Sequence, residues 1–184
     1  LHVTILGGGN VGSTLAQKLA QSNNIGSVKI AARDPTKTTS SIREKGVTDD
    51  VSVVAATPEA LSTSNVVILA MPGLYEDDDI KSFVSSLGDM TDKIILDATN
   101  PLGPYTAGLQ VKTWEGGISS GEKLQQHLPN AKVYKTFNTV GVEHMREALG
   151  KEMFIAGEAD PSYRAIAVGF KPFYVGPIRY ARNL

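Results

Sequence analysis

The sequence lacks several features that would point to other classes of protein. None of its 184 residues is cysteine, which excludes a disulfide framework, a thiol nucleophile and a cysteine-ligated metal site. The histidines His2, His127 and His144 are scattered, and no serine has the spacing of a hydrolase nucleophile elbow. For His144 we favour a structural role over a role in a substrate pocket. We therefore predict neither a catalytic triad nor a metal site.

Charge and hydropathy exclude further partners. The formal net charge is −1, so the composition does not indicate a nucleic-acid-binding surface. No apolar run reaches the roughly 18 residues of a membrane-spanning helix, and no secretory signal is visible. We expect a cytoplasmic protein without a membrane segment. The sequence begins with Leu1 rather than Met, which leaves open whether the chain is trimmed. Because a domain typically has about 150 residues, we predict one domain over residues 1–184.

The start of the sequence has the pattern of a buried strand, a glycine turn and a helix. Gly7, Gly9 and Gly12 have the G-x-G-x-x-G spacing, with apolar residues before them and a helical apolar period after them. Such a turn leaves backbone N–H groups free at a helix N-terminus, where the helix dipole favours a pyrophosphate. The pattern predicts a dinucleotide site. The alternative is a glycine-rich turn in another kind of α/β protein.

Strand-like and helix-like patterns alternate along the rest of the chain. The expected strands cover residues 3–6, 28–32, 51–55, 65–70, 93–97, 133–136, 153–156 and 173–175. The expected helices follow the first glycines, begin at 57–58, lie near 77–87, run from 119 to 129, include Val142, Met145 and Leu149, and run from 160 to about 168. Residues 36–45 allow only a short, exposed helix. This alternation predicts an α/β fold with a single Rossmann-type doubly wound sheet of about eight strands, the first six parallel.

The residue after the second strand predicts which dinucleotide binds. NAD enzymes carry an acidic residue there, whereas this chain has Arg33, with Lys37 one turn further on. A guanidinium can donate two hydrogen bonds to a 2′-phosphate, and a lysine adds a point charge. We therefore predict NADP(H). Two alternatives stay open: Asp34 could accept the 2′-hydroxyl of NAD, and Arg33 could be a solvated surface charge.

Three consecutive aspartates, Asp77, Asp78 and Asp79, begin the helix expected near 77–87. Carboxylates at a helix N-terminus usually interact with the helix dipole, and we favour this interpretation over a metal site.

The sequence has few candidate acid–base groups, and this scarcity is informative about the reaction. Hydride transfer between two rings needs alignment and exclusion of water more than a proton shuttle.

Six blocks of the sequence resemble the coenzyme F420-dependent NADP oxidoreductase family, which includes the oxidoreductase domain of the STEAP metalloreductases. These blocks are residues 5–12, 32–35, 98–102, 135–139, 153–157 and 174–177. The resemblance extends over nearly the whole chain. It implies a single domain in which NADPH lies across the carboxyl ends of the strands, with a flavin or deazaflavin stacked against the nicotinamide.

The resemblance also implies a role for each strand end. The implied nucleotide-binding residues are Gly7, Gly9, Asn10, Val11 and Gly12 for the pyrophosphate, Arg33 and Lys37 for the 2′-phosphate, Met71, Pro72 and Gly73 for the adenosine ribose, and Asn100, Pro101, Asn138 and Thr139 for the nicotinamide end.

Two departures from the family concern the second substrate. Relatives usually continue beyond residue 184 with a further helix, and residues 102–119 have no recognisable acceptor-binding pattern. Whether the chain forms a homodimer is left open.

We therefore expect an NADPH-dependent oxidoreductase that exchanges a hydride with a small flavin-like acceptor, such as F420, FMN or FAD. One alternative is a reductase of a small imine or keto substrate, like the pyrroline-carboxylate reductases. Those enzymes need a helical dimerisation domain, which this sequence could not supply. The other alternative is a non-catalytic NADP(H)-sensing module, which the few ionisable residues would equally allow.

Overall fold

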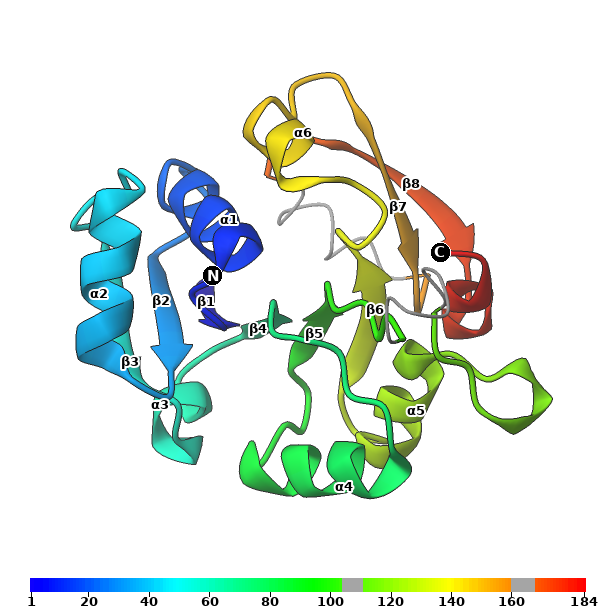
Figure 1. The fold of residues 1–184 in the computed structure, drawn as a ribbon. Helices are drawn as coiled ribbons and strands as arrows, with labels where there is room; N and C mark the ends of the chain where they lie inside the picture. The colour runs from blue at the N-terminus through cyan, green and yellow to red at the C-terminus, as the bar shows by residue number, and fades with distance from the viewer. Residues whose placement is uncertain (104–110, 160–167) are drawn as a thin grey trace.

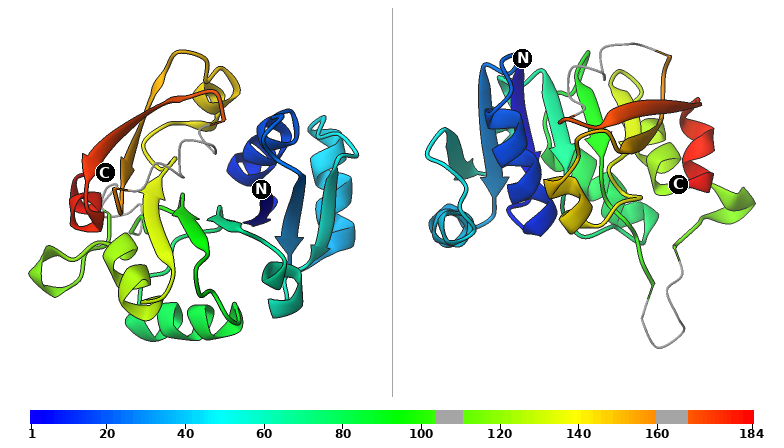
Figure 2. Two further views of the ribbon diagram at one scale, coloured as in Figure 1. Left: turned by 180° about the vertical axis from the view of Figure 1, so that it is seen from behind. Right: turned by 90° about the horizontal axis from the view of Figure 1, so that it is seen from above.

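A computed structural model describes residues 1–103, 111–159 and 168–184, and an eight-stranded sheet forms its centre (Figure 1). The strands are β1 (His2–Leu6), β2 (Ser27–Ala32), β3 (Val51–Ala55), β4 (Val66–Leu69), β5 (Ile94–Asp97), β6 (Lys132–Thr136), β7 (Glu152–Ala156) and β8 (Lys171–Gly176). Their order is β3-β2-β1-β4-β5-β6-β7-β8, with β3 and β8 at the edges (Figure 2). Strands β1 to β6 are parallel, which confirms the predicted sheet. Strand β7 is antiparallel to β6, and β8 is parallel to β7.

Helices cover both faces of this sheet. Helices α1 (Asn10–Ala20), α2 (Pro35–Glu44) and α6 (Val142–Arg146) contribute to the apolar cluster on one face. Helices α3 (Pro58–Ser62), α4 (Asp77–Ser86) and α5 (Ser120–His127) contribute to the cluster on the other. The 3₁₀ helices η2 (Glu115–Gly117) and η4 (Ile178–Asn183) complete the described elements. In residues 1–103, 111–159 and 168–184, no helix has the length and apolarity needed to cross a membrane.

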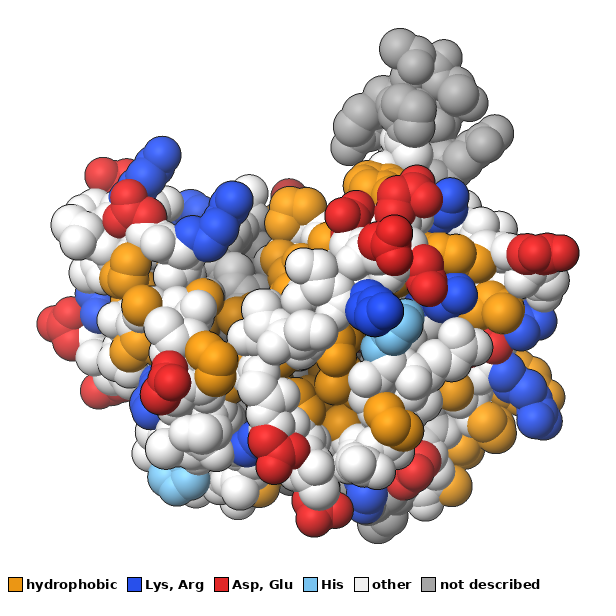
Figure 3. Space-filling view, turned by 90° about the horizontal axis from the view of Figure 1, so that it is seen from below, with side chains coloured by type: hydrophobic (Ala, Val, Ile, Leu, Met, Phe, Trp, Pro, Cys, Tyr) orange, Lys and Arg blue, Asp and Glu red, His pale blue; other side chains and the backbone are white. Residues whose placement is uncertain are grey.

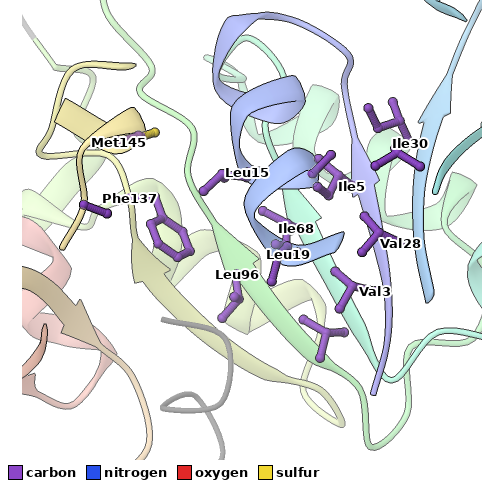
Figure 4. Close-up of a cluster of buried hydrophobic side chains, with 14 of the residues drawn as sticks. Val3, Ile5, Leu15, Leu19, Val28, Ile30, Ile68, Leu96, Phe137 and Met145 are labelled. Carbon is purple, nitrogen blue, oxygen red and sulfur yellow. The ribbon is translucent and has the colours of Figure 1, made fainter. Parts of the chain in front are cut away.

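The two apolar clusters follow from the alternation of side chains along each strand. In β4, Val66 and Ile68 belong to the cluster under α1, whereas Val67 and Leu69 belong to the opposite cluster. All four side chains are buried, which is why this central strand has a continuous apolar sequence. Figure 4 shows the first cluster, where Leu15 and Leu19 of α1 and Met145 of α6 face apolar side chains of the sheet.

Several helix boundaries agree with the sequence signals. The hydroxyl of Thr57 accepts a hydrogen bond from the backbone N–H of Ala60, and Pro58 is the first helical residue of α3. Ser119 and Glu122 form the expected capping box of α5, in which each side chain accepts a hydrogen bond from the other residue's backbone N–H. These boundaries depend on contacts within one helical turn, so the sequence predicts them well.

Other expectations differ from the structure. Helix α2, expected to be short, has ten residues, although it is exposed as expected and Ile42 is its one buried side chain. Helix α6 ends at Arg146, and Leu149 is 92% exposed instead of continuing its apolar face. Leu149 lies beyond the helix end, so helical periodicity no longer determines where its side chain points. The helix expected from residue 160 lies outside the described residues.

A charged contact holds the C-terminal helix η4 on α5. Both the Nε and Nη2 atoms of Arg182 donate hydrogen bonds to the Glu122 carboxylate, with a shortest distance of 2.7 Å. The Nη1 atom donates to the carbonyl of Gly116 in η2. Burial alone would raise the pKa of Glu122, but hydrogen bonds from Arg182 and Ser119 outweigh it and lower that pKa. The carboxylate therefore joins the N-terminus of α5 to η4, which lies 60 residues further along the chain.

The lowered pKa of Glu122 predicts a pH-dependent contribution to stability. The contribution should be complete above the ordinary pKa of 4.5 and disappear as the pH falls through the lower pKa of the folded state. We expect Glu122→Gln to reduce the free energy of unfolding at pH 7, with the difference from wild type shrinking below pH 4.5. Urea unfolding across this range measures the effect. A difference independent of pH would contradict it.

Candidate functional site

The turn between β1 and α1 depends on two of its glycines for backbone reasons. Gly7 has φ +110°, and a Cβ there would lie 2.5 Å from the carbonyl oxygen of Ala70 after β4. A Cβ on Gly12 would overlap the carbonyl oxygen of Gly7. Gly9 is different, because its φ of −69° suits any residue and no atom lies within 4 Å of a Cβ built on it. Gly7 and Gly12 are thus needed by the fold, whereas Gly9 faces open space.

A cleft of about 980 Å³ begins at this turn and lies along the ends of β1, β2 and β4. Its lining includes these residues expected from the sequence: Gly7, Gly9, Arg33, Lys37, Met71, Pro72 and Gly73. Arg33 and Lys37 are exposed, and within the described residues neither side chain has an ion-pair partner. The cleft therefore combines a glycine turn with two free cations, an arrangement suited to a ligand with several phosphates.

Asp34, the alternative partner for an NAD ribose, is engaged in the local structure. It is the N-cap of α2, and its Oδ1 atom accepts a hydrogen bond of 2.9 Å from the backbone N–H of Lys37. Pro35 follows as the first helical residue. The cap holds the first turn of α2 beside the cleft, so that Lys37 and Arg33 lie at the same wall.

The remaining predicted residues do not line this cleft. Asn10, Val11 and Gly12 begin α1, and Val11 packs against the apolar cluster beneath that helix.

The cleft also has an apolar wall that the sequence analysis did not predict. That wall contains Ala56, Leu61, Leu74, Phe83 and Leu87. These residues come from α3, α4 and the adjoining segments, and their periodicity indicates only that they are partly buried.

A second group of predicted residues gathers at the ends of β5 and β6. The Nδ2 atom of Asn100 donates a 2.9 Å hydrogen bond to the backbone carbonyl of Asn138. The Nδ2 atom of Asn138 lies 3.4 Å from Asn100 Oδ1 and 3.0 Å from the carbonyl oxygen of Leu184. The Oδ1 atom of Asn138 is buried and has no hydrogen-bond partner in the described part of the chain. Thr139, the next residue, is exposed.

The two groups are adjacent because the turn after β4 packs on the turn after β5. A Cβ on Gly73 would overlap Pro101, so glycine is needed for this close approach. Gly73 lines the cleft, and Pro101 lies in the segment that connects β5 to β6. The ends of β1, β2, β4, β5 and β6 therefore form one continuous edge, as expected for a doubly wound sheet.

Two charged residues beside this edge escaped the sequence analysis. Asp97 ends β5 and Lys135 lies in β6, and their side chains are 0% and 4% exposed with an Nζ–Oδ2 distance of 2.9 Å. Each interrupts an apolar strand, which is the signal that could have identified them. The sequence could not show that they are partners, because they are 38 positions apart.

Asp77, the first of the three aspartates that begin α4, has protein partners. Asp77 Oδ1 lies 2.9 Å from Lys123 Nζ and 3.5 Å from His127 Nε2, both on α5. The hydrogen bond from Lys123, with a smaller contribution from His127, lowers the pKa of Asp77. Figure 3 shows acidic, basic and histidine side chains close together on the face that it draws. No group of three or more potential metal ligands occurs among the described residues. His144 is exposed and lies 3.4 Å from Lys151 Nζ.

Comparison with known proteins identifies the family. Residues 2–101 match the model of the family described as NADP oxidoreductase, coenzyme F420-dependent. The chain belongs to this family. The matched residues run from β1 to the turn after β5 and include the whole lining of the cleft. The protein is therefore a member of a family of NADP-dependent oxidoreductases, as the sequence resemblance implied. No match was found among curated protein sequences.

Solved structures share the fold of this family member over nearly its full length. A hypothetical protein from Sinorhizobium meliloti has a TM-score of 0.76 at 26% identity, covering 100% of this chain and 88% of that one. A protein from Arthrobacter sp. FB24, described as a candidate F420-dependent NADP reductase, has a TM-score of 0.75 at 24% identity, with 98% and 87% covered. Pyrroline carboxylate reductase from Plasmodium falciparum, solved with NADP, has a TM-score of 0.62 at 10% identity, with 95% and 57% covered.

The different environments of the glycines predict different effects of alanine. Gly12→Ala should lower the free energy of unfolding by about 1–3 kcal/mol, because the overlap with Gly7 outweighs the gain of up to about 1 kcal/mol in helix propensity. Gly9→Ala, the matched control, should lower it by less than about 1 kcal/mol, because the new methyl group meets no atom and the only cost is the weaker preference of alanine for the N-cap position. Urea unfolding compares the two. Equal losses would contradict the distinct roles of these glycines.

Proposed function

We propose that this protein transfers a hydride between NADP(H) and a flavin or deazaflavin, with F420 as the leading acceptor. The observation that carries the proposal is the cleft at the carboxyl edge of the sheet, where a glycine turn lies near Arg33 and Lys37, two cations without an ion-pair partner in the described part of the chain. Membership of the F420-dependent NADP oxidoreductase family supports the nucleotide and suggests the acceptor.

In this proposal each part of the cleft binds one part of NADP(H). Backbone N–H groups of residues 8–12 hold the pyrophosphate at the N-terminus of α1, where the helix dipole is favourable, whereas the N–H of Gly7 donates to the carbonyl of Ala31. Arg33 binds the 2′-phosphate and Lys37 adds a charge. Met71, Pro72 and Gly73 line the path of the adenosine ribose, and the apolar wall with Leu74 and Phe83 suits an adenine ring.

The nicotinamide end then extends over β4, β5 and β6, towards Asn100, Pro101, Asn138 and Thr139. When bound, NADPH supplies the hydride from its nicotinamide ring. The residues of this chain orient the two rings and exclude water, because hydride transfer between rings needs alignment more than acid–base groups. The amide groups of Asn100 and Asn138 suit this role, since the buried Oδ1 atom of Asn138 lacks a protein donor in the described residues.

NADPH oxidation with purified protein tests the acceptor. We expect turnover with F420, and assays with FMN, FAD and ferric chelates should define how far the acceptor range extends. Tight NADPH binding without turnover of any acceptor would contradict the enzymatic proposal and favour an NADP(H)-sensing module. Turnover of a cyclic imine or keto acid, but not of flavin-like rings, would favour the reductase alternative.

The role proposed for Arg33 predicts a change in nucleotide preference. Arg33→Ala should weaken NADPH binding by roughly ten-fold or more, because a charge-assisted hydrogen bond contributes about 1.5–3 kcal/mol. NADH has no 2′-phosphate, so its affinity should hardly change. Lys37→Ala should have a smaller effect that salt reduces, since its ammonium is an exposed charge.

Titration of wild type and variants with both nucleotides measures this preference. Arg179→Ala is the matched control, because Arg179 is exposed on η4 and does not line the cleft. Equal losses for NADPH and NADH in Arg33→Ala would mean that Arg33 shapes the loop without reading the phosphate. A wild type that prefers NADH, with the largest loss in Asp34→Ala, would assign the selectivity to Asp34.

A further inference from the structure

One row of side chains across the sheet changes character at β5 and β6. Paired positions connect Ala31 of β2, Leu6 of β1 and Leu69 of β4 with Asp97 of β5 and Lys135 of β6. The first three positions are apolar, and the last two form a buried ion pair. All of them are less than a tenth exposed. The charges therefore lie inside the sheet, beside the turns that would face the nicotinamide half of NADP(H).

The ion pair directs its hydrogen bonds to the turn after β5. Asp97 Oδ1 accepts hydrogen bonds from the backbone N–H of Thr99, at 3.0 Å, and from its hydroxyl, at 2.7 Å. Lys135 Nζ donates to Asp97 Oδ2, at 2.9 Å, and to the backbone carbonyl of Thr99. The N–H, hydroxyl and carbonyl of one residue are thus fixed by two charged side chains.

This arrangement is more than the stability of the sheet requires. Removing two charges from water is costly, and a buried ion pair can often be replaced by apolar residues without loss of stability. The apolar residues Leu6 and Leu69 already occupy the same row in the neighbouring strands. The desolvation of Asp97 and Lys135 costs free energy, and their other hydrogen bonds all go to the Thr99 turn. This indicates that the position of that turn matters.

The fixed turn carries the residues that face the edge of the sheet. Asn100 follows Thr99 directly and donates its hydrogen bond to the carbonyl of Asn138. Asn138 in turn follows Phe137, whose φ of +63° is unusual for an aromatic residue. The Phe137 ring is buried in the apolar cluster, which holds this backbone conformation. A continuous set of contacts therefore leads from the ion pair to both asparagines.

We propose that Asp97 and Lys135 are positioning residues for the nicotinamide ring. They fix the Thr99 turn, and through it Asn100 and Asn138, so that the ring is held in one orientation for hydride transfer. Both side chains are buried beneath the turn, so they act through it and do not touch the ligand. This inference rests on the proposed NADP(H)-dependent function, and it assigns a role to residues outside the cleft.

The test replaces the pair without leaving a single buried charge. In Asp97→Val/Lys135→Met no buried charge is left unpaired, so we expect the variant to fold, with a moderate loss of thermal stability because Thr99 loses its hydrogen-bond partners. We expect kcat with F420 to fall roughly ten- to a hundred-fold while the KM for NADPH changes much less, because misplacement of a reacting group lowers the rate of the chemical step. The fluorescence of bound NADPH, which arises from its nicotinamide ring, should shift towards that of free NADPH. The affinity for adenosine 2′,5′-bisphosphate, which has no nicotinamide, should not change.

Two further variants separate position from general stability. Asp97→Asn/Lys135→Met keeps a side-chain oxygen that can accept hydrogen bonds from Thr99. Its kcat should therefore lie between those of the wild type and of Asp97→Val/Lys135→Met. This variant replaces Asp97→Val/Lys135→Met in the test if the latter does not fold. Lys93→Met is the matched control. Like Lys135, Lys93 makes two hydrogen bonds through its Nζ atom, here to the backbone carbonyls of Ser62 and Ser64, but it lies just before β5, at the opposite end of that strand from Asp97. It should lose stability without loss of kcat.

The outcomes distinguish this inference from the proposed function. If Asp97→Val/Lys135→Met or Asp97→Asn/Lys135→Met folds and has the nicotinamide fluorescence and kcat of the wild type, the positioning role is overturned and the proposed function is not. A loss of kcat in Lys93→Met as large as in the apolar pair would also overturn it, because the effect would then reflect stability. A wild type that binds neither NADPH nor adenosine 2′,5′-bisphosphate would overturn the proposed function, and the positioning role with it. Altered fluorescence without F420 turnover in any variant would support positioning and point to a different acceptor.

Discussion

One close backbone contact determines where the cleft of this protein lies. Gly12, in the first turn of α1, packs so tightly on the carbonyl of Gly7 that a Cβ would overlap it, and Gly7 packs in turn on the carbonyl of Ala70. These contacts bring the end of β1, the end of β4 and the N-terminus of α1 together. Free backbone N–H groups and the positive end of the helix dipole then face the same space. The position of the cleft is therefore a consequence of main-chain packing.

The selectivity that we propose for the cleft has a different physical basis. Arg33 and Lys37 are exposed side chains beside a turn whose shape is maintained by the Asp34 cap of α2 and by Pro35. The fold does not need their charges, so this wall can change its ligand preference without repacking the sheet. That separation fits the comparisons, in which structures with 10% to 26% identity share the fold. It also explains why the fold alone does not determine the nucleotide or the acceptor.

The other half of the edge uses buried charge where the first half uses glycine. At β5 and β6, Asp97 and Lys135 hold the Thr99 turn by hydrogen bonds, and the strained backbone of Phe137 sets the start of the next turn. Both devices give a loop a fixed position without a regular ladder of backbone hydrogen bonds. The edge of the sheet is thus rigid along its length, although different interactions make it so. Such rigidity is what the alignment of two rings would require.

The sequence by itself determined the features that depend on neighbouring residues. The glycine spacing of residues 7–12, the capping box of Ser119 and Glu122, and the apolar runs of the strands were enough for the α/β class and the six parallel strands, and six sequence blocks carried the resemblance to the family. Only the tertiary structure decided which distant residues meet: Phe83 in the cleft wall, Asp97 beside Lys135, Arg182 on Glu122, and Leu149 in solvent. The reason is physical. Capping and periodicity act within a turn or a few residues, whereas strand order, register and helix packing depend on the simultaneous burial of side chains far apart in the chain.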